Sequence, residues 1–203
     1  MISLVRHAES AANAGQATLD PSLIPLTENG WRQAEALSRT ICQAPDLIIT
    51  SPFARAIDTS KPTVAKYPKV EVQIWNIGEF TYLDPVRCAG TTVAERRASV
   101  ESYWAAADPD FVDGLGAESF SAFIDRAQVA LEAFRSLNNN TLVFGHGQVM
   151  QAMRWLHLRV PGPISADAMR EFRQFDLANP IHNCQTIILE VHEAASNPAI
   201  RMD

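Results

Sequence analysis

The sequence predicts an α/β fold, a three-layer sandwich with a mostly parallel central sheet and helices on both faces. Short runs rich in β-branched residues alternate with segments of helical period along the 203 residues. Apolar residues make up 47% of the chain and charged residues 20%, which suits a large core and a hydrated surface. We find no repeat, low-complexity tract or linker, so we expect a single domain over residues 1–203.

The first half of the chain supplies three of the expected strands and two helices. Trp31, Ala34, Leu37 and Ile41 share one helical face, and Thr27 precedes them as a candidate N-cap. In the next helical segment, Ser51 and Pro52 have the pattern of an N-cap followed by proline at the first helical position. The expected strands are Ile2–Val5, Leu47–Thr50 and Val70–Ile74.

The second half begins with an excursion that breaks the alternation, residues 76–117. It contains one expected helix, opened by Thr92–Glu95 in capping-box form, and we expect it to lie over one end of the sheet. An apolar stripe from Phe120 to Phe134 predicts a long helix that ends before Asn138. The remaining expected elements are a strand at Thr141–Phe144, a helix near Gln148–Leu158, and a hairpin of Phe172–Ala178 with Thr186–His192 at or near one sheet edge.

Charge and cysteine content exclude several classes of protein. The formal net charge is −6 and the isoelectric point about 5.4, which argues against binding nucleic-acid backbones. The three cysteines form neither a disulfide framework nor a paired metal-ligand pattern. No stretch resembles a signal peptide or reaches membrane-spanning length. We therefore expect a cytoplasmic protein without membrane or nucleic-acid partners, and the sequence leaves its oligomeric state open.

The candidate site follows from what comes after each predicted strand, because ligands bind beyond the carboxyl ends of parallel strands. Arg6 and His7 follow the first strand, and Arg55 lies shortly after the second. His146 follows the strand that ends at Phe144, and Glu79 comes a few residues after the third strand. Two arginines, two histidines and one carboxylic acid are thus expected at one end of the sheet.

These residue types suit phosphoryl transfer, in which negative charge spreads over three oxygens of the transferred group. Arg6 and Arg55 would bind those oxygens through their planar donor forks. His7 would attack phosphorus as a neutral imidazole, and neighbouring cations favour that form by lowering its pKa. His146 would be a second cation or donor. Glu79 would protonate the leaving group and then accept a proton from water, which requires a raised pKa.

The same segments carry a family resemblance. Five segments resemble, in order, the blocks of the histidine phosphatase superfamily, also called the phosphoglycerate mutase-like family. They are residues 6–10 with Asn13, residues 25–34, residues 51–59, Ile77–Glu79 with Glu79, and Gly145–Gly147 with His146. The resemblance spans about residues 2–190 and implies that family's domain, with 76–117 as a cap-like insertion. It also implies a phosphate pocket of Arg6, Arg55 and His146, with Asn13 and the Gly147 amide contributing; Ser10 is compatible with a contact through its hydroxyl.

Two positions depart from the pattern of that family. Ala8 stands where the signature usually has glycine, and a methyl group there restricts the backbone slightly without removing a catalytic group. The sequence after Glu79 is Phe-Thr-Tyr-Leu-Asp, without the glycine and Trp-Glu that often follow in the family. Asp84 is therefore a reserve candidate for the acid.

The other polar clusters have plainer interpretations. His157, His182 and His192 are expected to be surface or packing residues, and Glu190 with His192 lacks partner ligands for a metal site. We therefore predict neither a metal nor a cofactor. Arg87, Arg96 and Arg97 in the excursion form either a solvated face or a lid that contacts the substrate.

The sequence thus predicts a metal-independent phosphatase that hydrolyses a phosphomonoester of a small molecule through phosphohistidine. A mutase or phosphotransferase, returning the phosphoryl group to a second hydroxyl, is the first alternative. The mutase branch resembles a longer chain with Trp-Asn where this sequence has Ala12 and Asn13. A non-catalytic phosphate-binding module is the second alternative. The substrate itself cannot be predicted, because specificity in such scaffolds lies in loops.

Overall fold

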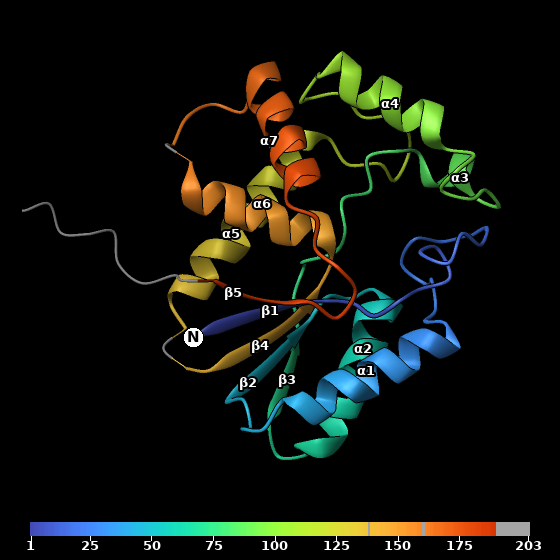
Figure 1. Ribbon diagram of the computed structural model, residues 1–203. Helices are drawn as coiled ribbons and strands as arrows, with labels where there is room; N and C mark the ends of the chain where they lie inside the picture. The colour runs from blue at the N-terminus through green and yellow to red at the C-terminus, as the bar shows by residue number, and fades with distance from the viewer. Residues whose placement is uncertain (138, 160, 190–203) are drawn as a thin grey trace, which may run out of the picture.

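The computed structural model describes residues 1–137, 139–159 and 161–189 (Figure 1). A five-stranded sheet with the order β3-β2-β4-β1-β5 lies at its centre. The first four of these neighbours run parallel, and β5 pairs antiparallel with β1. The strands are β1 (Ile2–Arg6), β2 (Leu47–Thr50), β3 (Glu71–Ile74), β4 (Thr141–Gly145) and β5 (Thr186–Leu189). The predicted α/β sandwich with a mostly parallel sheet is confirmed.

Helices cover both faces of the sheet (Figure 1). Helices α1 (Glu28–Thr40) and α2 (Ala54–Lys66) lie on one face, and α5 (Phe120–Arg135) and α6 (Gly147–Leu158) lie on the other. Thr27 caps α1 as predicted, since its side chain accepts a hydrogen bond from the Gly30 amide. Within the residues that the structure describes, no helix combines the length and apolarity needed to cross a bilayer.

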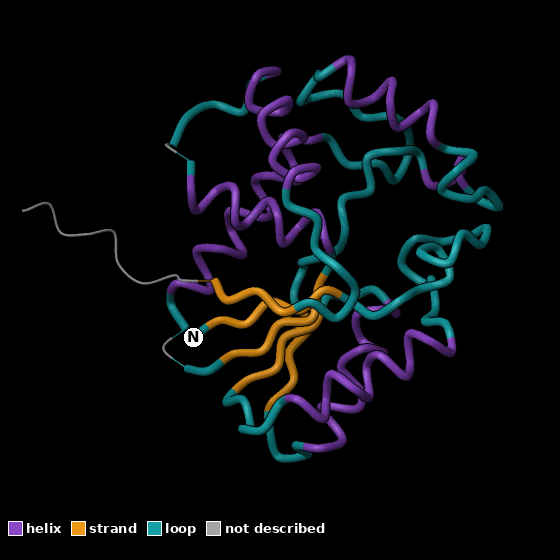
Figure 2. The backbone as a smooth tube through the Cα atoms, viewed as in Figure 1, coloured by secondary structure: helices purple, strands orange, loops and turns teal. Residues whose placement is uncertain are grey.

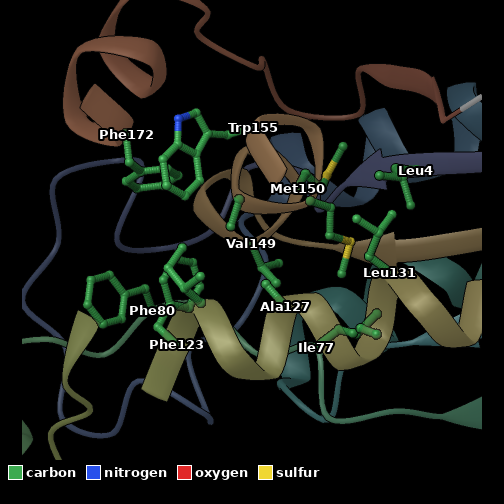
Figure 3. Close-up of a cluster of buried hydrophobic side chains, with 14 of the residues drawn as sticks. Leu4, Ile77, Phe80, Phe123, Ala127, Leu131, Val149, Met150, Trp155 and Phe172 are labelled. Atoms are coloured by element: carbon green, nitrogen blue, oxygen red, sulfur yellow. The ribbon is translucent and has the colours of Figure 1, made fainter. Parts of the chain in front are cut away.

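The alternation of side chains along the strands divides the core between the two faces. On β1, Leu4 joins a large cluster with α5, α6 and α7 (Ala166–Ala178), whereas Val5 packs with a smaller cluster that Leu37 and Val64 cover from α1 and α2. In the large cluster, Phe123, Leu131, Val149 and Trp155 interdigitate above the sheet (Figure 3). Both layers fix the sheet rigidly, and with it the carboxyl ends of the strands.

The chain between β3 and α5 holds two helices, α3 (Pro85–Cys88) and α4 (Arg97–Ala106). The predicted capping-box hydrogen bonds form, because Thr92 Oγ1 accepts from the Glu95 amide and Glu95 Oε2 accepts from the Thr92 amide. They close a turn, however, and α4 begins only at Arg97. The prediction of one helix opened by Thr92 is wrong in its start, and the short α3 was not predicted.

The predicted hairpin near the C-terminus is wrong in its first strand. Residues 172–178 belong to helix α7 (Ala166–Ala178), which Ser165 caps by accepting from the Ala168 amide. Ala168, Met169 and Phe172 recur at helical spacing and are buried, so burial of this stripe outweighs the β propensity of the aromatic residues. The second run forms β5 at the sheet edge, as predicted, through Leu189; its remaining residues 190–192 lie outside the described residues.

Candidate active site

The register of the sheet places the ends of β1, β2 and β4, which carry predicted site residues, side by side. Arg6 lies opposite Gly145 in the β1–β4 pair, and Thr50 lies opposite Phe144 in the β2–β4 pair. His7, Ser51 and His146 therefore leave the sheet together, where Figure 2 shows loops gathered beyond the strand ends. The rings of His7 and His146 are 5.2 Å apart between centroids.

His7 is held as a neutral imidazole with a defined unprotonated nitrogen. Its Nδ1 lies 2.7 Å from the carbonyl oxygen of Ala8, which can only accept, so Nδ1 carries the proton. Its Nε2 accepts a hydrogen bond from Arg55 Nε at 3.1 Å. Burial, and then the Arg55 charge, lower the pKa of His7 from 6.5 to about 3. The Nε2 lone pair is thus available at neutral pH and lies beside a guanidinium.

Arg55 occupies the first turn of α2 and is almost fully buried. Its Nη1 donates to the carbonyl of Pro21 at 2.6 Å, and its guanidinium lies over the ring of Phe53, 5.0 Å from the centroid. Burial lowers the pKa of Arg55 to about 10, so the side chain keeps its charge at neutral pH. These contacts orient a cation toward His7 Nε2.

His146 and Ser51 form a buried pair that corrects one prediction. Ser51 was expected to cap α2, but Phe53 is the N-cap residue and α2 begins at Ala54. Ser51 Oγ instead lies 2.7 Å from His146 Nε2 and accepts from the Phe53 amide at 3.2 Å. While it accepts from that amide, the hydroxyl can donate its proton to Nε2, and this arrangement places the proton of the neutral imidazole on Nδ1. Burial, followed by the Arg55 charge, lowers the pKa of His146 well below 6.5.

Glu79 reaches the same site and lies at the N-terminus of α6. Its Oε1 accepts from the amides of Phe80 and Gln148 at 3.1 Å each and from that of Val149 at 3.3 Å. Burial raises the pKa of Glu79, and this effect outweighs the opposing Arg55 charge and the amide hydrogen bonds. A carboxyl group with a raised pKa is what an acid that later becomes a base requires.

Arg6 ends β1 directly before His7, and its charge contributes to the lowered pKa of His7. Its Nη1 donates to the carbonyl of Ile181, and a Cβ built at Gly147 would lie 3.6 Å from Arg6 Nε. Arg6 Nε and His146 Nδ1 are both buried and have no hydrogen-bond partner within the described part of the chain. Leaving a buried polar atom unpaired costs about 1–3 kcal/mol. Arg6 Nε is a donor, and so is His146 Nδ1 when Ser51 donates to Nε2, so both can pair with an acceptor on a ligand.

Ser10 and Asn13 lie in the loop after β1, bonded to each other rather than aimed separately at the site. Asn13 Oδ1 accepts from Ser10 Oγ at 3.1 Å and from Asn183 Nδ2, also at 3.1 Å. Asn183 Nδ2 also donates to the His7 carbonyl at 2.8 Å. Sequence reasoning placed Asn183 only in a turn; its approach from the C-terminal part of the chain, 176 residues after His7, left no local signal.

Ala8 is accommodated where the family signature usually has glycine. It is fully buried with a negative φ, and its amide donates to Thr59 Oγ1 at 2.9 Å. The close approach falls instead at Gly30 in α1, where an added Cβ would lie 2.0 Å from the carbonyl oxygen of Glu9. The glycine that this loop needs is therefore Gly30, and the methyl group of Ala8 packs against Leu26 and Ala34.

The reserve candidate for the acid is engaged elsewhere. Asp84 caps α3, its Oδ1 accepting from the Val86 amide at 2.8 Å. Of the excursion's arginines, Arg87 pairs with Asp113 and Arg97 lies 3.8 Å from Glu101. Arg96 lines a cavity of about 220 Å³ that also reaches Arg55 and Glu79.

The comparisons with known proteins agree with this geometry. The sequence model described as "Histidine phosphatase superfamily (branch 1)" matches residues 2–196. The chain belongs to the histidine phosphatase superfamily. A search of curated proteins gave no match to it.

Solved structures share the fold of this member of the superfamily. The alpha-ribazole phosphatase from Shigella flexneri is 20% identical, with a TM-score of 0.68 over 94% of this chain and 91% of that chain. Phosphoserine phosphatase from Entamoeba histolytica is 20% identical, with a TM-score of 0.66 over 91% and 87%. The mycobacterial glucosyl-3-phosphoglycerate phosphatase is 19% identical, with a TM-score of 0.66 over 91% and 87%. At this identity the likeness establishes the fold, not the substrate.

The depressed pKa of His7 makes the stability of this protein depend on pH. The unfolded chain binds a proton near pH 6.5, whereas folded His7 does so only near pH 3, so acidification favours the unfolded state. Relative to H7N, the wild type is expected to lose about 2 kcal/mol of unfolding free energy between pH 7 and pH 5. Urea unfolding at both pH values measures this, with H157N, at an exposed position on α6, as control. Parallel changes in wild type and H7N would contradict the assignment.

Proposed function

We propose that this protein hydrolyses a phosphomonoester of a small molecule without a metal, through a phosphohistidine on His7. The observation that carries the proposal is that Arg6 Nε and His146 Nδ1 are buried without a hydrogen-bond partner among the described residues, with the His146 ring 5.2 Å from that of His7. Phosphoryl oxygens are strong acceptors that would pair both donors. Arg6 and Arg55 supply fixed positive charge for the transition state.

In the first half-reaction, Nε2 of His7 forms a bond to phosphorus while the ester P–O bond breaks. Arg55 Nε, which donates to that nitrogen at 3.1 Å, exchanges this hydrogen bond for one to a phosphoryl oxygen and so frees the lone pair. Protonated Glu79 transfers its proton to the departing alkoxide. The carbonyl of Ala8 accepts from Nδ1 and stabilises the charge that the imidazole gains.

In the second half-reaction, Glu79 is a carboxylate and accepts a proton from water as the water oxygen bonds to phosphorus. The N–P bond breaks, inorganic phosphate leaves, and both His7 and Glu79 return to their starting states. His146 donates through Nδ1 as a neutral imidazole held by Ser51. Its role is thus that of a hydrogen-bond donor, because burial disfavours the cationic form.

Release of phosphate from a chromogenic aryl phosphate in the presence of EDTA tests the proposal. We expect turnover that persists with the chelator, because the guanidinium groups carry the positive charge. Activity that is lost to EDTA and restored by a divalent cation would contradict the metal-free mechanism. Tight phosphate binding without turnover would favour the binding-module alternative, and isomerisation of a sugar or glycerate phosphate faster than phosphate release would favour the mutase.

A further inference from the structure

The cavity of about 220 Å³ beside Glu79 has a polar end and apolar walls. Arg55 and Glu79 border it together with apolar side chains from four parts of the chain. Ligand sites typically combine such apolar walls with a few polar groups that fix orientation. The apolar side chains that matter below are Leu19, Ile24, Phe53, Leu83, Val93 and Val100.

Two of the segments that line the cavity are joined to each other by backbone hydrogen bonds. Thr18, in the loop after β1, forms an isolated antiparallel bridge with Thr91, between α3 and α4. The Thr18 amide donates to the Thr91 carbonyl at 3.2 Å, and the Gly90 amide donates to the Thr18 carbonyl at 2.8 Å. The bridge holds the segment that contains Leu19 against the segment that contains Val93, and both residues line the cavity. Backbone hydrogen bonds therefore hold two of the segments that line the cavity in place.

Two of the apolar side chains that line this cavity are largely in contact with water. Leu19 is 76% exposed and Val93 is 54% exposed. Covering such surface with an apolar group is favourable by about 25 cal/mol per Å². A polar phosphate ester such as a sugar phosphate would gain nothing from these walls.

Arg96 introduces a second charge into the cavity. It lies half-buried at the N-terminus of α4, and within the described residues its guanidinium has no hydrogen bond or ion pair to another side chain. Its neighbours Arg87 and Arg97 do have acidic partners. Arg96 is close enough to Glu95 to lower the pKa of that carboxyl, but in the described part of the chain its guanidinium donors are not used in an ion pair, so they are suited to a ligand anion.

We propose that the substrate is a phosphomonoester whose alcohol carries an apolar body, aromatic or branched aliphatic, with a second anionic group that Arg96 binds. The body lies between Leu19 and Val93 while the phosphoryl group lies at His7. The proposal rests on the phosphatase function and names its substrate class.

Three phosphates of primary alcohols with the same leaving group test this: propyl phosphate, 3-phenylpropyl phosphate and 3-(4-carboxyphenyl)propyl phosphate. We expect the phenyl group to raise kcat/KM at least about tenfold over propyl phosphate. The carboxylate is expected to add about another tenfold. V93N should lower the phenyl advantage, and R96Q should abolish the carboxylate advantage by lowering kcat/KM for 3-(4-carboxyphenyl)propyl phosphate more than that for 3-phenylpropyl phosphate.

Matched controls separate these effects from general damage. V129N, on the exposed surface of α5, and R97Q should behave as the wild type. Equal kcat/KM for propyl and 3-phenylpropyl phosphate would overturn the apolar part, and a carboxylate effect that survives R96Q would overturn the assignment of Arg96. If p-nitrophenyl phosphate is hydrolysed through His7 while the panel is flat, the substrate class is wrong and the function stands. If no phosphate is hydrolysed, the function itself fails.

Discussion

Replacing His7 by alanine is expected to lower kcat for p-nitrophenyl phosphate by about 10⁴-fold or more, because no other group can take its place as nucleophile. The Nε2 atom of His7 lies where Arg55 already donates at 3.1 Å, so the phosphoryl group would meet a lone pair and a cation together. Rapid quenching of the wild type with ³²P-labelled substrate should trap an acid-labile adduct on His7.

The matched control is His157→Ala, which removes an exposed histidine from the end of α6. It should keep wild-type kcat and still yield the adduct. An H7A variant that is folded by circular dichroism and retains more than about a tenth of the activity would remove His7 from the reaction. An adduct mapped to another residue would do the same.

Replacing Glu79 by glutamine is expected to lower kcat/KM for propyl phosphate by about 10³-fold, but that for p-nitrophenyl phosphate by less than about tenfold. The difference arises because an alkoxide needs a proton to leave, whereas nitrophenolate does not. Glutamine can still accept from the amides of Gln148 and Val149 through its carbonyl oxygen, so the site should keep its shape.

The pH profile provides a second measurement of the role of Glu79. In the free enzyme its pKa lies above the ordinary 4.5, and only the protonated form donates, so kcat/KM for propyl phosphate should fall as pH rises through that value. E79Q should lose this limb. D84N is the matched control, because asparagine also caps helices and Asp84 caps α3. Equal losses on both substrates in E79Q, or the larger alkyl loss in D84N, would assign the acid elsewhere.

The sequence by itself determined that the sheet is mostly parallel and which candidate residues follow its strands. Parallel strands are buried on both faces, so Ile2–Arg6 and Thr141–Gly145 appear as apolar runs whose ends are marked by Arg6-His7 and Gly145-His146-Gly147. That His7 and His146 lie at the same end of the sheet was predicted from topology alone, because the carboxyl ends of neighbouring parallel strands meet at one edge. The register of β1 and β4 agrees with it.

Only the tertiary structure decided how those residues are held and what surrounds them. Ser51 has the pattern of a helix cap, but its hydroxyl lies against His146, and Asn183 approaches His7 from near the other end of the chain. Residues 172–178 are helical because Phe172 is buried against α5 and α6. These contacts involve residues distant in sequence, so local β propensity does not reveal them. The sequence predicted a lowered pKa for His7 and a raised pKa for Glu79, but burial, which is the largest cause at both residues, depends on the packing that only the folded structure shows.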